Sequence, residues 1–172
     1  HRVRVLANVE FPSEIPAALE AGAEGIGLFR TEFLVRARSP MPSEADHLRA
    51  YRDALSMLDG KPLVIRTYDL GADKLNPDPG AEREPNPFLG RRSLRLCLER
   101  MDIFVPQVRA ILRASAFGDV RVLLPMVGSV GEFLRAKEVF DAERARLRRE
   151  GAHPAMEQPL GVMVEVPAAA IS

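Results

Sequence analysis

The stretch that decides the fold is Gly22–Leu34 (GAEGIGLFRTEFL), in which an apolar segment over residues 25–29 runs directly into the charged residues Arg30 and Glu32. Its glycines remove side chains at positions where a neighbouring backbone or a ligand comes close. The pattern predicts a short β-strand that delivers a fixed cation, Arg30, to one end of a sheet. An alternative is that Arg30 and Glu32 simply pair with each other on the surface, which contributes little to stability.

Two further apolar segments end on a charged residue. Leu63–Ile65 is followed by Arg66, and Leu160–Val164 is followed by Glu165. An arginine fork binds phosphate oxygens in pairs, and a carboxylate holds a hard divalent cation such as Mg²⁺. The three segment ends together predict an anion clamp beside a metal ligand, which indicates phosphate chemistry.

Strand and helix patterns alternate along the chain. Strands are expected near residues 3–8, 25–29, 62–66, 120–125 and 160–165, and helices near 11–22, 43–60, 91–100, 103–116, 129–150 and from 167 onward. Ser43 and Ser129 are the expected N-caps of two of these helices, the second in a capping box with Glu132. The alternation predicts an α/β fold with parallel strands and crossover helices.

Two architectures fit this order, an open sheet and a barrel. In both, ligands bind at the C-terminal ends of the strands, where Arg30, Arg66 and Glu165 are expected. Five strand–helix units are fewer than the eight of a closed barrel, and the sequence stops soon after Pro167 opens a helix. We therefore expect the sequence to be a fragment of a longer protein.

Composition restricts the function classes. The 172 residues carry 24 basic and 24 acidic side chains, so the zero net charge does not favour nucleic-acid binding. No apolar run approaches the roughly 20 residues of a membrane span, and no signal peptide is evident. The single cysteine, Cys97, predicts a core residue in a reduced, cytoplasmic protein. The three histidines show no ligand spacing and are predicted to face solvent: His1, His47 and His153.

Residues 68–90 are rich in proline and glycine and predict a long loop with a functional role. Arg91 and Arg92 follow it where the next helix begins. A helix N-terminus attracts anions, so these arginines either extend the anion site or form a solvated helix start.

Five segments in this order resemble the phosphoenolpyruvate-binding domain of the phosphoenolpyruvate-utilising enzymes. They are Gly22–Leu34, Val64–Lys74 (VIRTYDLGADK), Glu84–Arg92 (EPNPFLGRR), Ile111–Gly118 (ILRASAFG) and Gly161–Ala170 (GVMVEVPAAA). The fourth segment favours enzyme I of the bacterial sugar phosphotransferase system within this family. The resemblance implies a (β/α)₈ barrel, of which residues 1–172 would form a partial domain of about the first five strand–helix units.

The resemblance also implies site roles. Arg30 and Arg66 match the arginines that grip the phosphoryl group of phosphoenolpyruvate, and Arg92 matches a further arginine of the same pocket. Glu165 matches one of two carboxylate ligands of a catalytic Mg²⁺. The residues that lie in the motifs and are expected to support the site are Glu32, Asp69, Lys74 and Asn86.

Other parts of the family's site have no match here. The second metal ligand, in a motif resembling GTNDL, the arginine for the substrate carboxylate and the cysteine that protonates the enolate would lie beyond Ser172. The phosphorylated histidine belongs to a separate N-terminal domain, through which a histidine phosphocarrier protein would be the partner. Ala72 stands where enzyme I usually has glycine. The isolated segment is therefore expected to be inactive, and the full-length protein to be a homodimer.

Two alternatives stay open on the sequence. The chain could come from a pyruvate phosphate dikinase or a phosphoenolpyruvate synthase, whose full gene would also encode an ATP-grasp domain. It could also be a non-catalytic module used for dimerisation, since the arginines are present but half of the site has no match.

Overall fold

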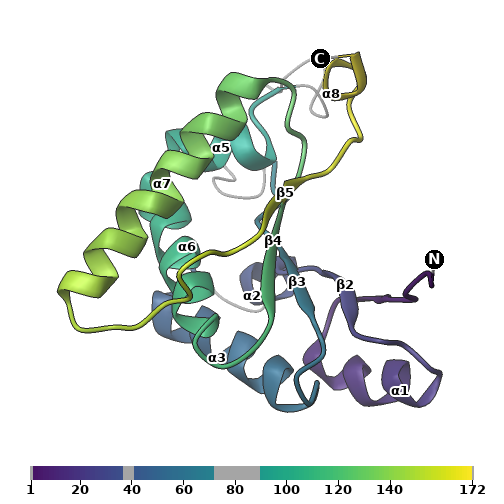
Figure 1. The fold of residues 1–172 in the computed structure, drawn as a ribbon. Helices are drawn as coiled ribbons and strands as arrows, with labels where there is room; N and C mark the ends of the chain where they lie inside the picture. Colours follow the sequence, from purple (N-terminus) through teal and green to yellow (C-terminus); the bar gives the residue numbers. More distant parts are fainter. Residues whose placement is uncertain (1, 37–40, 72–89, 172) are drawn as a thin grey trace.

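The apolar segments of the sequence form one parallel sheet in a computed structural model, which describes residues 2–36, 41–71 and 90–171. The strands are β1 (Ala7–Val9), β2 (Ile26–Phe29), β3 (Leu63–Arg66), β4 (Val120–Leu124) and β5 (Leu160–Val162). They lie in the order β1-β2-β3-β4-β5, and every neighbouring pair is parallel (Figure 1). The predicted α/β fold with consecutive parallel strands is confirmed.

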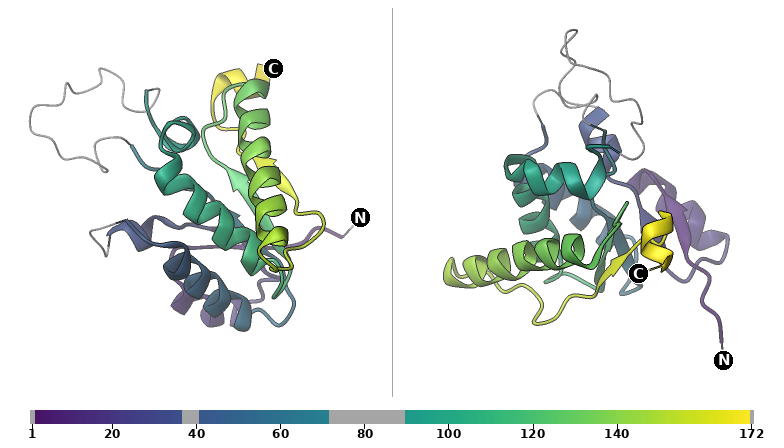
Figure 2. Two further views of the ribbon diagram at one scale, coloured as in Figure 1. Left: turned by 90° about the vertical axis from the view of Figure 1, so that its left-hand side faces the viewer. Right: turned by 90° about the horizontal axis from the view of Figure 1, so that it is seen from above.

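The helices that join the strands are mostly those that the sequence predicts. They are η1 (Pro12–Glu14), α1 (Ile15–Glu20), α2 (Glu32–Arg36), α3 (Glu44–Ser56), α5 (Ser93–Glu99), α6 (Met101–Ala114), α7 (Val130–Arg149) and α8 (Pro167–Ile171). Helices α3, α5, α6 and α7 cover one side of the sheet (Figures 1 and 2). The short helix α2 was not predicted, because it begins only three residues after β2 ends and coincides with the charged end of that segment.

Burial alternates along the central strands, as the two-residue period of a strand requires. In β3, Leu63 and Ile65 are fully buried, and in β4 Val122 and Leu124 are buried. Because successive side chains point to opposite faces, Arg66 shares a face with Val64 and not with the buried Ile65. The core therefore forms on one face of the sheet, and the arginine is kept out of it.

Two glycines allow neighbouring segments to come close: Gly25, directly before β2, and Gly27, within it. A side chain at Gly25, whose φ is +143°, would lie 2.7 Å from the ring of Pro62, and one at Gly27 would lie 2.8 Å from Leu6 Cβ. Only glycine fits such positions without displacing its neighbours. The interpretation of these glycines as sites of close approach is confirmed for the backbone.

The first and last strands differ from their predicted bounds. The segment around Val3 and Val5 was expected to be a strand, but β1 begins at Ala7 and both valines are exposed. β2 begins only at Ile26, which pairs with Ala7, so there is no strand for the earlier residues to join. β5 ends at Val162 because β4 offers it only three partners, the last of them Leu124.

The prediction for His47 is wrong, because this histidine is fully buried on α3. Its ring nitrogens lie 3.1 Å from the hydroxyl of Tyr51 and 2.5 Å from that of Tyr68, which compensates the loss of water. His153 is exposed as predicted, while His1 lies outside the described residues. Cys97 is a buried core residue, also as predicted.

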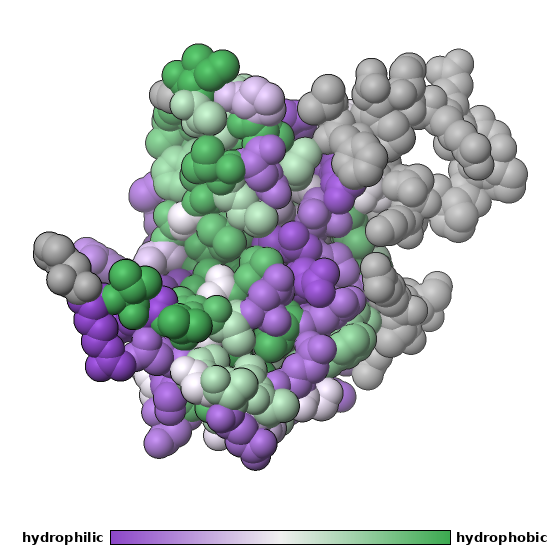
Figure 3. Space-filling model, turned by 90° about the vertical axis from the view of Figure 1, so that its right-hand side faces the viewer, coloured by the Kyte–Doolittle hydropathy of each residue, from purple (hydrophilic) through white to green (hydrophobic). Residues whose placement is uncertain are grey.

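The side of the sheet away from α3, α6 and α7 carries exposed apolar side chains. Figure 3 shows them on the face that lies on the right of Figure 1, where the N-terminal segment, β5 and α8 run. The large exposed members include Val3, Val5, Val164 and Ile171. In the described ranges, no helix has the length and apolar character needed to cross a membrane.

Candidate functional site

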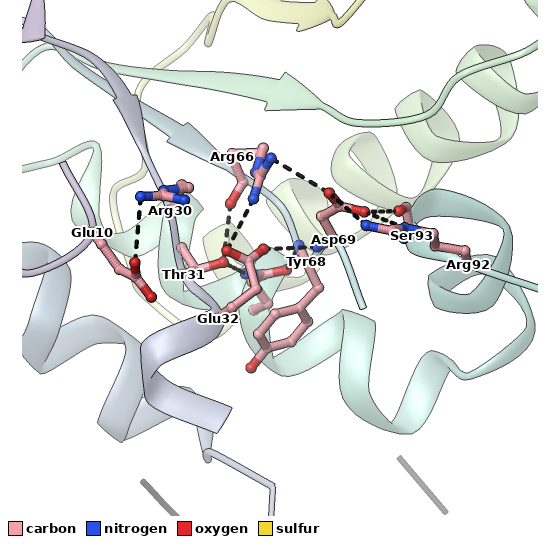
Figure 4. Close-up of polar contacts among 10 residues, drawn as sticks. Glu10, Arg30, Thr31, Glu32, Arg66, Tyr68, Asp69, Arg92 and Ser93 are labelled. Carbon is pink, nitrogen blue, oxygen red and sulfur yellow. Dashed lines mark hydrogen bonds and ion pairs between the residues drawn. The ribbon is translucent and has the colours of Figure 1, made fainter. Parts of the chain in front are cut away.

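Arg30 and Arg66 lie next to each other at the carboxyl end of the sheet. Each follows or ends one of two adjacent parallel strands, and the preceding residues Phe29 and Ile65 are register partners. Figure 4 shows both guanidinium groups on the same side of the strand ends. The geometry thus brings two cations to one place, as expected from the sequence.

Each arginine has its own carboxylate. Arg66 lies 3.0 Å from Glu32 and 3.5 Å from Asp69, whereas Arg30 lies 3.3 Å from Glu10 (Figure 4). The alternative of an exposed Arg30–Glu32 pair is wrong, because Glu32 opens α2 and turns toward β3. There Glu32 is 8% exposed and also accepts a 2.8 Å hydrogen bond from the backbone N–H of Asp69.

Asp69 joins the arginine of β3 to the start of α5. Its carboxylate accepts hydrogen bonds from Arg92 Nε at 2.9 Å and from the hydroxyl of Ser93. Burial alone would raise the pKa of Asp69, but these hydrogen bonds and the charges of Arg92 and Arg66 outweigh it, so the pKa lies below its usual range. Asp69 is therefore a fixed anion that orients two arginines.

The described residues that these contacts link form the strand-end cluster: Glu10, Arg30, Glu32, Arg66, Asp69, Arg92 and Ser93. Two members of the predicted set, Lys74 and Asn86, lie outside the described residues. Glu10 and Ser93 were not predicted. The rule that singled out Arg30 would have found Glu10, since it directly follows β1.

Glu165 lies apart from the strand-end cluster. It follows β5, which is separated from β3 by β4, and its carboxylate accepts a 2.7 Å hydrogen bond from the backbone N–H of Met126. Within residues 2–36, 41–71 and 90–171, no three His, Cys, Asp or Glu side chains gather closely enough to hold a metal ion. Glu165 and the arginines share the carboxyl end of the sheet, but no contact in the described part of the chain joins them.

Backbone strain is found at both places. Ser93, which contacts Asp69, has a φ of 53°, and Met126, which contacts Glu165, has a φ of 55°. Residues other than glycine adopt this left-handed conformation at a cost, and such positions concentrate at functional sites. A third such residue, Asp59 with a φ of 45°, lies in the turn before β3, so strain supports the candidate site only together with the contacts of Ser93 and Met126.

Unsatisfied polar atoms also gather there. In the described part of the chain, five buried side-chain polar atoms lack a hydrogen-bond partner, and three of them are Arg30 Nε, Arg66 Nε and Thr67 Oγ1. Buried donors are almost always satisfied, so two adjacent guanidinium groups, each with a buried Nε–H that no described residue accepts, mark this end of the sheet as a candidate site.

Comparison with known families gives a single assignment. Residues 1–172 match the model of the phosphoenolpyruvate-binding domain of phosphoenolpyruvate-utilising enzymes. The chain belongs to this family. The resemblance inferred from five short segments is therefore confirmed over the full sequence.

Three curated relatives carry the same name. The chain is 47% identical over 170 residues to the phosphoenolpyruvate-protein phosphotransferase of Staphylococcus carnosus and 43% identical over 171 residues to that of Priestia megaterium. It is 46% identical over 169 residues to the protein of the same name from Geobacillus stearothermophilus. These matches cover 98–99% of this chain but only 29–30% of each relative. The chain thus spans less than a third of the length of these proteins.

Proposed function

We propose that this chain is the phosphoenolpyruvate-binding part of an enzyme that transfers the phosphoryl group of phosphoenolpyruvate to one of its own histidines. That reaction is the first step of a bacterial sugar phosphotransferase system. The names of the curated relatives support the reaction, and the strand-end cluster supplies the chemistry that it needs.

The observation that carries the proposal is the pair of guanidinium groups, Arg30 and Arg66, that lie side by side at the ends of adjacent strands. Arg66 is held by Glu32 and Asp69 before any ligand arrives, and its side chain is only 11% exposed. A guanidinium that is fixed in advance loses little freedom when it binds a phosphate, and it forms charge-assisted hydrogen bonds. Arg92, oriented by Asp69, adds a third cation from the neighbouring helix start.

The residues present fit a Mg²⁺ ion in kind. Glu165 offers a carboxylate at the carboxyl end of β5, and among the described residues only one of its oxygens is engaged, by Met126. Mg²⁺ prefers oxygen ligands and is commonly held by one or two carboxylates together with substrate phosphate oxygens. When bound, the ion would neutralise the charge that develops on the phosphoryl and leaving-group oxygens. Glu165 would hold it together with a second carboxylate outside this chain.

The proposed reaction moves one group. A histidine nitrogen attacks the phosphorus atom, a P–N bond forms as the P–O bond of phosphoenolpyruvate breaks, and the enolate of pyruvate leaves and takes up a proton. Arg30, Arg66 and Arg92 would hold the phosphoryl oxygens in line with the attacking nitrogen. Positioning and charge stabilisation of this kind supply most of the catalysis in phosphoryl transfer. The attacking histidine and the proton donor would come from outside residues 1–172.

The wider setting follows from the same proposal. The domain would be part of a (β/α)₈ barrel, in which further strands extend the parallel sheet beyond β5. The full-length enzyme would work in the cytoplasm as a homodimer and pass the phosphoryl group to a histidine phosphocarrier protein. Lys74 and Asn86 would support the pocket from the segment between β3 and α5.

The test uses the full-length protein that carries this chain. Phosphoenolpyruvate labelled in its phosphoryl group is added with Mg²⁺ and without nucleotide, and both pyruvate release and label on the protein are measured. We expect stoichiometric, acid-labile and base-stable labelling, as phosphohistidine gives, and an equal amount of pyruvate. The label should then move to an added histidine phosphocarrier protein.

Two other outcomes would overturn the proposal. A requirement for ATP or AMP would assign the protein to the dikinases or synthases instead. The absence of both label and pyruvate from a folded full-length protein would leave a non-catalytic module as the explanation.

A further inference from the structure

Gln107 is a fully buried amide on α6 that the sequence analysis did not single out. Its side chain reaches two segments that carry the site arginines. Gln107 Oε1 accepts a 3.1 Å hydrogen bond from the backbone N–H of Tyr68, and its Nε2 donates at 3.0 Å to the hydroxyl of Thr31. One side chain from the helix layer thus contacts the chain just beyond both β2 and β3.

The two contacted residues sit among the members of the strand-end cluster. Thr31 lies between Arg30 and Glu32, and Tyr68 lies between Arg66 and Asp69, separated from Arg66 by one residue. Thr31, also fully buried, donates a 3.1 Å hydrogen bond to the backbone carbonyl of Arg66 (Figure 4). The path from Gln107 through Thr31 to Arg66 fixes the ends of the two strands relative to each other.

We propose that Gln107 is a positioning residue for the phosphoryl-binding arginines, acting through Thr31 and Tyr68. The inference rests on the proposed function, because it assigns Gln107 a role in binding that same phosphoryl group. The hydrogen bonds of Gln107 go to Tyr68, Thr31 and Tyr51, none of which is a member of the strand-end cluster. It sets the distance between Arg30 and Arg66 by holding the backbone on either side.

The physical reason is that both strand ends are followed by irregular backbone. β2 ends at Phe29 and β3 at Arg66. One further backbone bond follows each strand, from Arg30 N–H to Val9 O and from Thr67 N–H to Leu123 O, both at 3.0 Å. These bonds run to the outer neighbours β1 and β4, so they do not join the two strand ends to each other. Gln107 makes this connection, because its buried amide accepts from the segment after β3, at Tyr68, and donates to the segment after β2, at Thr31. A shift of about 1 Å in a positioning group costs as much as a hundredfold in rate, so small movements of the arginines should be measurable.

The test compares Gln107→Met, which keeps the length of the side chain and removes its hydrogen bonds to Tyr68, Thr31 and Tyr51, with Thr31→Val and Thr31→Ser. In the full-length protein we expect Gln107→Met and Thr31→Val each to weaken phosphoenolpyruvate binding and lower kcat/KM by about tenfold or more. Thr31→Ser keeps the hydroxyl and should retain wild-type affinity. The double variant Gln107→Met/Thr31→Val should lose little more than either single variant, because both break one path.

Arg109→Met is the matched control, because Arg109 lies on the same helix and its partners belong to the helix layer: Glu44, Glu143 and Glu150. It should lower the melting temperature at least as much as Gln107→Met does, yet leave the affinity for phosphoenolpyruvate unchanged well below that temperature. A merely structural role for Gln107 would reduce the active fraction, which lowers kcat and leaves Kd at its wild-type value.

The outcomes separate this inference from the proposed function. If the wild-type protein does not release pyruvate from phosphoenolpyruvate, the proposed function fails. If the wild type is active and folded Gln107→Met or Thr31→Val binds phosphoenolpyruvate within twofold of it, the function stands and the positioning role is wrong.

Discussion

Two partly buried arginines, Arg109 in the helix layer and Arg66 at the strand ends, are paired with carboxylates in different ways. Arg109 donates from Nε to Glu44 at 2.7 Å, from NH1 to Glu143 at 3.2 Å and from NH2 to Glu150 at 2.6 Å. Arg66 donates at 3.0 Å to Glu32 and approaches Asp69 at 3.5 Å, while its Nε–H has no acceptor among the described residues.

The difference separates a structural arginine from a binding one. The hydrogen bond to Glu150, with those to Glu44 and Glu143, raises the pKa of Arg109 against the opposing effect of burial. Its donor groups are used, so a ligand would gain nothing by approaching it. Arg66 is oriented but not saturated, because only two of its five N–H groups face Glu32 and Asp69, and phosphate oxygens can accept from others.

The largest expected effect comes from Arg66→Lys, which keeps the charge and removes the planar fork. We expect kcat/KM of the full-length protein for phosphoenolpyruvate to fall by about 10²–10³-fold, the loss typical of one charge-stabilising donor. Steady-state kinetics with phosphoenolpyruvate as the varied substrate give the value. The same substitution at the saturated arginine, Arg109→Lys, should change kcat/KM less than twofold. Equal losses of kcat/KM in Arg66→Lys and Arg109→Lys would contradict the assignment of Arg66 as a binding arginine and Arg109 as a structural one.

The second effect concerns the free energy of unfolding, for which we expect Arg109 to matter more than Arg66. Arg109→Met removes one of the two arginines that pair with Glu143, whose side chain is 6% exposed, and leaves only the exposed Arg146 at 3.0 Å. Removing one partner of a buried pair costs about 3–5 kcal/mol, and the exposed Glu150 places this site near the lower figure. Arg113 also pairs with Glu44 but is 44% exposed. We therefore expect Arg113→Met to cost less than about 1 kcal/mol.

Hydrogen exchange of the buried amides in β3 and β4 measures these losses within the full-length protein, because such amides report the free energy of opening the whole core. Activity below the melting temperature should be retained in both variants. A larger loss of stability for Arg113→Met than for Arg109→Met would show that burial does not decide how much each of these arginines stabilises the protein.

The fold could largely be predicted from the sequence because its signals are local. Alternating burial in β3 and β4 follows from the residue pattern, and Ser43 caps α3 by accepting a hydrogen bond from Asp46 N–H as predicted. The capping box at Ser129 is only half formed. Ser129 accepts from Glu132 N–H, but the Glu132 side chain accepts from Gly128 N–H and Arg95 instead. The N–H of the preceding residue and a side chain from α5 thus take the place of the Ser129 N–H.

The site was less predictable because pairing is a long-range property. The sequence placed Arg30 and Arg66 at strand ends, yet it could not show that Glu32 turns away from its neighbour Arg30 to reach Arg66, 34 residues further along the chain. Gln107 gives a weaker signal still. It is a polar residue on an otherwise apolar helix face, and only the fold reveals that Thr31, 76 residues away, is its partner.

His47 lies on α3, the helix that also carries Glu44, and contacts Tyr68, which follows β3. The last prediction concerns the charge of this buried histidine, which lies between Arg109 of the helix layer and Arg66 at the strand ends. Burial lowers its pKa from 6.5 to about 4, against the opposing charge of Asp46. A charged ring would donate from both nitrogens, so both tyrosine hydroxyls would have to accept from it, and its charge would be buried, which disfavours the protonated form. The folded state therefore keeps the ring neutral.

Between pH 6.5 and 4 the unfolded chain binds a proton at His47 that the folded chain does not. This contribution to stability is complete above about pH 6.5 and is lost as the pH falls, by about 2 kcal/mol at pH 5. His47→Gln cannot titrate and keeps one donor and one acceptor for the tyrosines, so its stability should fall less over the same range. Hydrogen exchange of β3 amides, corrected for intrinsic rates at each pH, gives the difference between the two proteins. Parallel pH profiles for wild type and variant would mean that the ring is not held neutral, and that the layer beneath the arginines tolerates charge.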